Sequence, residues 1–311
     1  LGSSLQEIFS EFNLDASFIP ISAKVNNVSQ GLKFRLYQNR DVEYLDFSNP
    51  SGYRVYIRSL CLVLYKAVHD VFPGSKLYIE HPISRGFYCN FIKPTSDGRT
   101  RGISTDEIAL IHKRMQEIVQ ENLPFHRNEV PTEEAIRIFR EHGFSDKVKL
   151  LETYDQVYSN YYTLGETADF YYGPLVPSAG FLKVFGLESY GDGMLLRVPD
   201  RKNPSLLAEM VPQPKTFDVY KEKVKWDVIM HLANAGDVNK ACQKGMASEI
   251  IQVSEALQEK KIVKIAEEID RRYNEEGLKL VLITGPSSSG KTTFCKRLGI
   301  QLLACGLRPL S

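Results

Sequence analysis

The sequence predicts a mixed fold, in which an α+β region with an antiparallel sheet and helices precedes the first strand, loop and helix of an α/β unit. Three observations lead to this prediction. Strand-like runs in hairpin order lie between amphipathic helices in the first two thirds of the chain. A charged stretch with helical periodicity covers residues 216–276. Beyond it, an apolar run leads into a loop rich in serine and glycine.

Residues 1–50 predict a small α+β unit that opens with a helix. Ser4 can cap this helix, and Glu7 follows three residues later, which is the spacing of a capping box. Short strand-like runs follow at 23–25, 34–37 and 40–45, with turn-forming residues between them.

A second predicted region covers residues 51–215. A long amphipathic helix begins near Ser51 and ends before Pro73. The hairpin predicted next has its strands at 76–83 and 86–91. Further helices are expected from Ser104, with Glu107 as the capping-box partner, and over 132–142. The Gly191-Asp192-Gly193 sequence predicts a later hairpin turn, and four prolines between 199 and 214 predict a loop-rich exit.

The C-terminal residues 277–311 carry the most specific motif. The β-forming run Leu278–Thr284 precedes a sequence that fits G-x-x-x-x-G-K-[ST], and a helical pattern follows. Backbone N–H groups in such a P-loop solvate phosphate oxygens at a helix N-terminus. We expect Lys291 to act as the catalytic cation on the β- and γ-phosphates of ATP, and Thr292 to bind Mg²⁺. The predicted nucleotide-binding residues are Gly285, Ser287, Ser288, Ser289, Gly290, Lys291, Thr292 and Thr293.

The composition and the charge limit the classes of protein to which the chain can belong. The 311 residues include 43% hydrophobic side chains and carry a formal net charge of +1, so no overall field attracts nucleic acid or a membrane. Apolar runs are far shorter than the ~18 residues of a membrane span, and no leader opens the chain. Five scattered cysteines favour reduced thiols and a cytoplasmic protein over a zinc ribbon or disulfide framework.

The loop Gly285–Thr293 and the residues after it resemble the uridine kinase and phosphoribulokinase family, over about the last 35 residues. The resemblance implies ATP-dependent phosphorylation of a nucleoside 5′-hydroxyl, with uridine or cytidine as substrate. The chain begins at Leu1 rather than at a methionine and stops at Ser311, ahead of the family's general base and lid. We therefore expect a fragment of a larger enzyme that is inactive alone.

The preceding residues resemble parts of threonyl-tRNA synthetases. The sequence Val25-Asn26-Asn27 and the run 40–45 are similar to the later part of a TGS domain, whose first hairpin would precede Leu1. Residues 51–215 resemble the second additional, editing-type domain. Its characteristic segments here include Gly86-Phe87-Tyr88 and the run 169–177. Residues 216–276 would then form a helical linker.

The metal-binding pattern of that editing-type domain is missing. The resemblance implies ligands in H-x-x-x-H and C-x-x-x-H patterns, and these four positions correspond to Arg58, Leu62, Tyr171 and Leu175. Aliphatic, guanidinium and neutral phenol groups are poor zinc ligands. We therefore expect no zinc and no editing hydrolysis, but a surviving pocket for a small ligand lined by Arg58, Tyr171 and Tyr172.

Two alternatives to a nucleoside kinase stay open. One is a regulatory module that binds tRNA or a small ligand, and the near-zero net charge argues against nucleic acid as the partner. The other is a P-loop GTPase with a TGS domain. The tyrosine-rich segment 154–172 could stack bases, although core packing is the commoner use of such aromatic residues. Assembly into a homo-oligomer is open as well.

Overall fold

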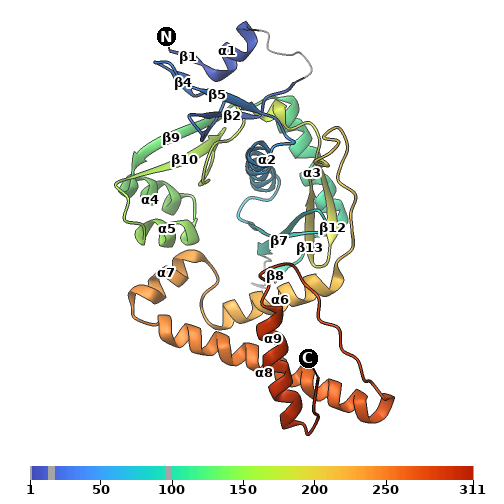
Figure 1. Cartoon of the computed structure of the whole chain (residues 1–311). Coiled ribbons are helices and arrows are strands. Elements are labelled where there is room, and N and C mark those ends of the chain that lie inside the picture. The colour runs from blue at the N-terminus through green and yellow to red at the C-terminus, as the bar shows by residue number, and fades with distance from the viewer. Residues whose placement is uncertain (1, 13–17, 95–99, 311) are drawn as a thin grey trace. The chain divides into compact units, whose positions relative to one another are not determined.

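The computed structural model describes residues 2–12, 18–94 and 100–310 (Figure 1). Contacts divide the chain into two compact units, Leu1–Asp237 and Val238–Ser311. Each unit has its own hydrophobic core. In the described ranges, no helix combines the length and the apolar character that crossing a bilayer requires.

The first unit opens with a small α+β subdomain. Helix α1 (Leu5–Glu11) has the predicted capping box, because the Glu7 N–H donates to Ser4 Oγ at 3.2 Å and the Ser4 N–H donates to Glu7 Oε2 at 2.7 Å. Strand β2 (Ser22–Val25) lies between β3 (Val28–Gln30) and β5 (Val42–Leu45), while β1 (Ser3–Ser4) pairs with β4 (Arg35–Leu36). Each of the three predicted runs contains a strand, over 22–25, 35–36 and 42–45, whereas the sequence pattern predicts neither β1 nor β3.

Helix α2 (Pro50–Val71) is the central element of the first unit. It starts at Asn49, whose side chain accepts a hydrogen bond from the Ser51 N–H, and it ends at Phe72 because Pro73 follows. Five consecutive residues, 60–64, are buried, so the helix is covered on all sides. Figure 1 shows α2 between two sheets. The elements of the site are therefore positioned around this helix.

The larger sheet has strand order β12-β13-β7-β6, and β8 pairs with β7. Its strands are β6 (Lys76–Ile83), β7 (Gly86–Pro94), β8 (Thr100–Arg101), β12 (Gly186–Tyr190) and β13 (Gly193–Arg197). All of these pairings are antiparallel, as predicted, and both expected hairpins are present. Helix α3 (Thr105–Gln120) has the predicted Ser104–Glu107 capping box and packs on α2.

The smaller sheet has the order β11-β10-β9 and forms the other side of the unit. Its strands are β9 (Phe125–Pro131), β10 (Tyr158–Leu164) and β11 (Thr167–Asp169). Helices α4 (Thr132–Glu141) and α5 (Ser145–Glu152) pack together through Phe139 and Leu151, and the short 3₁₀ helix η1 (Ala179–Phe181) follows the sheet. The sequence pattern predicts α4 but neither α5 nor this sheet.

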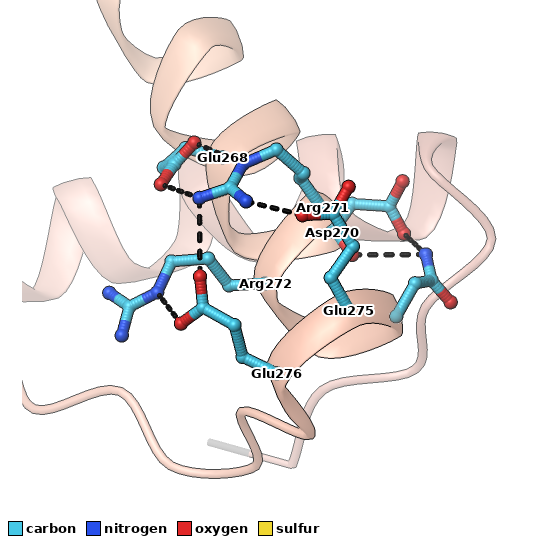
Figure 2. A network of polar contacts seen from close by, with 7 residues as sticks. Glu268, Asp270, Arg271, Arg272, Glu275 and Glu276 are labelled. Carbon is cyan, nitrogen blue, oxygen red and sulfur yellow. Dashed lines mark hydrogen bonds and ion pairs between the residues drawn. The ribbon is translucent and has the colours of Figure 1, made fainter.

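Helices dominate the rest of the chain. They are α6 (Pro214–Ile229), α7 (Ala235–Gln243), α8 (Ala247–Glu276) and α9 (Lys291–Ala304). Helices α8 and α9 share a core of Ile262, Ala266, Leu298 and Leu302. At the end of α8, the Arg271 guanidinium lies among three glutamates, Glu268, Glu275 and Glu276 (Figure 2). Helix α8 then stops at Gly277, which adopts a φ of 70°.

The strand predicted at Leu278–Thr284 is wrong for this structure. The segment is irregular, and no strand of the described residues pairs with it. A β-strand needs a neighbour to satisfy its backbone N–H and C=O groups, so β-forming composition alone does not produce one. The expected first strand of an α/β unit is therefore not formed here.

Candidate ligand site and phosphate-binding loop

A cavity of about 520 Å³ lies in the first unit, and we call it the Arg127 pocket. Its walls come from the loop before β4, from β9 and β10, and from the run 170–177. The lining residues used below are Lys33, Arg127, Asn160, Tyr162, Tyr171 and Tyr172. This volume suits a small organic ligand or a single nucleotide.

Two cations line the Arg127 pocket. Lys33 donates from Nζ to the carbonyl oxygen of Phe125 at 2.8 Å, which links the small N-terminal subdomain to β9. Partial burial lowers the pKa of Lys33. Arg127 is largely exposed, and its ion pair with Glu129 is long at 3.4 Å. Both cations are thus available to an anionic ligand group.

The wall of the pocket also carries an unsatisfied acceptor. Asn160 Oδ1 is buried and has no hydrogen-bond partner among the described residues. A buried acceptor without a donor is costly, so a ligand N–H or a water would stabilise it. Beside it, burial raises the pKa of Tyr162, and its phenol stays neutral. At the rim, the hydroxyl groups of Tyr172 and Tyr154 are 2.7 Å apart.

The predicted pocket of Arg58, Tyr171 and Tyr172 is correct for the two tyrosines only. Arg58 is not part of the lining, because its Nη1 donates to the carbonyl oxygen of Tyr172 at 2.7 Å. Its guanidinium also lies against Gly173, where an added Cβ would come within 3.1 Å of Nη1 and Nη2. Arg58 therefore binds the backbone of the run 170–177 instead of facing a ligand.

The four positions that correspond to metal ligands do not form a metal site. Leu62 and Leu175 are buried in the main core, and Arg58 is a cation. Burial raises the pKa of Tyr171, and its neutral phenol is a poor zinc ligand. Throughout the part of the chain that the structure describes, no group of three or more histidine, cysteine or acidic side chains could hold a metal ion. These residues do not fit zinc.

The P-loop residues lie together at the start of α9. Gly290 is the N-cap and has a φ of 79°, and Ser288 has a φ of 58°. Lys291 donates from Nζ to the carbonyl oxygens of Gly285 and Pro286, at 2.8 Å for Gly285. The loop thus turns directly into the N-terminus of a 14-residue helix. Its residues from Pro286 to Gly290 are exposed, and no sheet lies behind them in the described residues.

Comparisons with known proteins relate more than half of the chain to one group of enzymes. No protein-family model matches. The chain is 32% identical to a threonine–tRNA ligase of Syntrophotalea carbinolica over 170 residues, which are 54% of this chain and 26% of that ligase. It is 30% identical to the ligase of Syntrophomonas wolfei over 229 residues, 72% of this chain and 35% of the ligase. The chain carries a threonyl-tRNA synthetase-like domain. It spans about a quarter to a third of these ligases.

The resemblance to synthetases identifies some of the residues that line the Arg127 pocket and misses others. The resemblance led to Tyr171 and Tyr172, which line the pocket of this domain. It did not lead to Lys33, Arg127 or Asn160. The only sequence signal for Asn160 is a polar residue within an aromatic-rich strand, and nothing in the sequence marks Lys33 or Arg127 as neighbours. The kinase resemblance of the last residues remains a prediction.

Proposed function

We propose that the synthetase-like domain binds the single-stranded 3′ end of a tRNA and does not hydrolyse it. The observation that supports this most directly is the Arg127 pocket, which combines two cations, exposed aromatic rings and an unsatisfied acceptor. Cations hold phosphates, and rings such as Tyr172 and Phe34 stack on bases. The similarity to threonine–tRNA ligases gives further support.

We expect no hydrolysis by this domain, because it lacks the ligands that would hold a catalytic metal ion. A metal-bound water needs histidine, cysteine or carboxylate ligands, and the corresponding positions carry Arg58, Leu62, Tyr171 and Leu175. The domain would then recognise its ligand as a sensor and leave it intact.

Filter binding of tRNA at several salt concentrations tests this proposal. We expect Arg127→Gln and Lys33→Gln each to weaken binding and to reduce the slope of log K against log salt by about 0.7 to 0.9 for each phosphate that the variant no longer neutralises. Arg137→Gln is the matched control, since Arg137 is an exposed cation on α4 outside the pocket. Equal losses in all three variants, or no tRNA binding, would contradict the proposal.

We propose as a second function that the P-loop supplies the phosphate-binding part of a nucleoside kinase, with uridine or cytidine as the acceptor and Mg²⁺–ATP as the donor. The observation that favours it is the loop geometry, because Gly290 adopts the left-handed conformation directly before α9. In phosphoryl transfer, Lys291 would neutralise charge on the β- and γ-phosphates, and the Thr292 hydroxyl would hold Mg²⁺.

Hydrogen exchange of residues 285–293 with millimolar Mg²⁺–ATP tests the phosphate site. We expect ATP to protect the loop and Lys291→Ala to abolish this protection, whereas Lys296→Ala on the same helix should not. Protection by GTP but not by ATP would favour the GTPase alternative. Because the 311 residues contain only the start of the resemblance, we expect no uridine-dependent ADP release from them, and such release would overturn that expectation.

A further inference from the structure

A second cavity, of about 620 Å³, lies in the first unit and takes no part in the functions proposed above. We call it the Tyr65 pocket. Its walls come from α2, from strand β6 at the edge of the larger sheet, from the segment between α4 and α5, and from residues 169–171. Ala233, in the junction between α6 and α7, completes the lining.

The floor of the Tyr65 pocket already holds an ammonium group of the protein. Lys147 Nζ lies 4.0 Å from the ring centroid of Phe144 and 5.4 Å from that of Tyr65, and it forms an ion pair with Asp169. An ammonium over aromatic faces and beside a carboxylate is stabilised by cation–π attraction and by charge. The pocket therefore offers chemistry that suits organic cations.

Two further carboxylates lie on the walls without an ion pair. Within the described residues, neither Asp146 nor Glu80 forms a salt bridge, and both line the pocket. Burial raises the pKa of Tyr65, and the negative charges of Asp169 and Asp146 raise it further. The other lysine in the lining, Lys76, is exposed, and Lys147 is already neutralised by Asp169. Two unpaired carboxylates and one exposed lysine thus remain, beside His69 and His142 of the lining.

We propose that the Tyr65 pocket binds a small organic amine. Its ammonium would lie between Asp146 and Glu80, and its carbon chain would pack on the rings of Tyr65 and Tyr78. A carboxylate on the ligand would face the same two acids, so amines without an acid group should bind better than amino acids. The cavity volume is large enough for a diamine or a triamine.

The occupant would also contact the α6–α7 junction. Besides the contact through Ala233, this junction is fixed to α5, because Lys149 Nζ lies 2.7 Å from Asp237 Oδ1. Gly236 packs so closely on α5 that an added Cβ would lie 2.7 Å from the Leu150 nitrogen. Binding should therefore slow hydrogen exchange in residues 231–237, a readout that needs no substitution.

Calorimetric titration of the chain with putrescine, spermidine and threonine at fixed salt tests the inference. We expect the two amines to bind and threonine to bind more weakly. The double variant Glu80→Gln with Asp146→Asn should lose about tenfold in amine affinity. Asp218→Asn removes an exposed acid of α6 outside the pocket and should change affinity less than about twofold.

Three results would overturn the inference: no heat with any amine, tighter binding of threonine, or equal losses in the double variant and Asp218→Asn. If the double variant fails to fold, Glu80→Gln and Asp146→Asn are measured singly. Hydrogen exchange of residues 231–237 in the unaltered chain then still tests whether an amine binds. The two pockets share Phe170 and Tyr171, but Glu80 and Asp146 line the Tyr65 pocket alone. We therefore expect tRNA binding to persist in the double variant, so that failure of this inference and failure of the proposed tRNA function can be told apart.

Discussion

The guanidinium of Arg58 on α2 donates to the carbonyl oxygen of Tyr172 at 2.7 Å, although 114 residues separate them in sequence. This bond ties the central helix to the run 170–177, which forms one wall of the Arg127 pocket. Gly173, with a φ of 105°, lets the backbone approach the guanidinium. The shape of the pocket thus depends on a protein cation.

Replacing Arg58 should weaken the attachment of the run 170–177 to α2. We expect Arg58→Met to lower the free energy of unfolding of the first unit by about 1–2 kcal/mol, because a charge-assisted hydrogen bond is removed and a carbonyl is left without its donor. Urea denaturation measures the change. Arg54→Met on the same helix removes an exposed bond to Ser51 and should stay within about 0.5 kcal/mol. An equal effect of both substitutions would show that Arg58 does not fix the loop.

Gly52 in the first turn of α2 should tolerate no side chain. An added Cβ would lie 1.9 Å from the carbonyl oxygen of Asp46, and backbone cannot move aside cheaply. We expect Gly52→Ala to cost more than about 3 kcal/mol or to prevent folding of the first unit, as followed by circular dichroism. In contrast, Gly299→Ala in α9 meets only Pro309 Cγ, at 3.9 Å, and should stabilise its helix by about 0.5–1 kcal/mol. A mild effect at Gly52 would contradict this packing.

Glu80 should make the first unit less stable as pH rises. Burial, more than the nearby Asp192, raises the pKa of Glu80 above its ordinary value of 4.5. Below pH 4.5 the carboxyl is protonated in both states, whereas above it the unfolded chain releases the proton more readily. Stability is therefore lost between pH 4.5 and the raised pKa. We expect Glu80→Gln to increase the melting temperature at pH 7 and to change it little at pH 4.

The exposed Glu166→Gln in the same unit is the control for that experiment, and it should leave the pH profile of the melting temperature unchanged. A profile that Glu80→Gln also leaves unchanged would show that the Glu80 carboxyl is solvated in the folded state.

The arginine and glutamate network at the end of α8 should contribute little to the stability of the C-terminal unit (Figure 2). Arg271 reaches Glu268 at 2.7 Å and Glu275 at 2.5 Å, but all of these side chains are solvent-exposed. Exposed ion pairs are weak and are screened by salt. We expect Arg271→Gln to lower the melting temperature of the C-terminal unit slightly in low salt and not at all in 1 M NaCl. A loss that persists in high salt would indicate a structural role.

Structural features that depend on residues close together in the sequence could be predicted. The capping boxes at Ser4 and Ser104 and the hairpin turn at Gly191–Gly193 depend on residues only a few positions apart, and all three are confirmed. The antiparallel pairing of β6 with β7 and of β12 with β13 could also be predicted, because a short turn connects the two strands of each pair.

Contacts between distant residues could not be predicted in the same way. The sheet β11-β10-β9 depends on the pairing of Phe125 with Leu164, which no local pattern encodes. Similarly, the resemblance to the editing-type domain predicts that Arg58, at a metal-ligand position, faces the pocket, but its Nη1 donates to the Tyr172 carbonyl oxygen, 114 residues away. The run 278–284 has the composition of a strand without a partner that would make it one.

That unpaired run has a practical consequence. Leu280 and Leu282 are 70% and 83% exposed on an irregular, proline-free stretch in which Lys279 is the only charge between Leu278 and Ile283. Such a hexapeptide can associate edge to edge with copies of itself in concentrated solution. In purified samples it would be the first place for fibrous aggregates to nucleate, so Leu282→Lys should delay turbidity without disturbing the α8–α9 core.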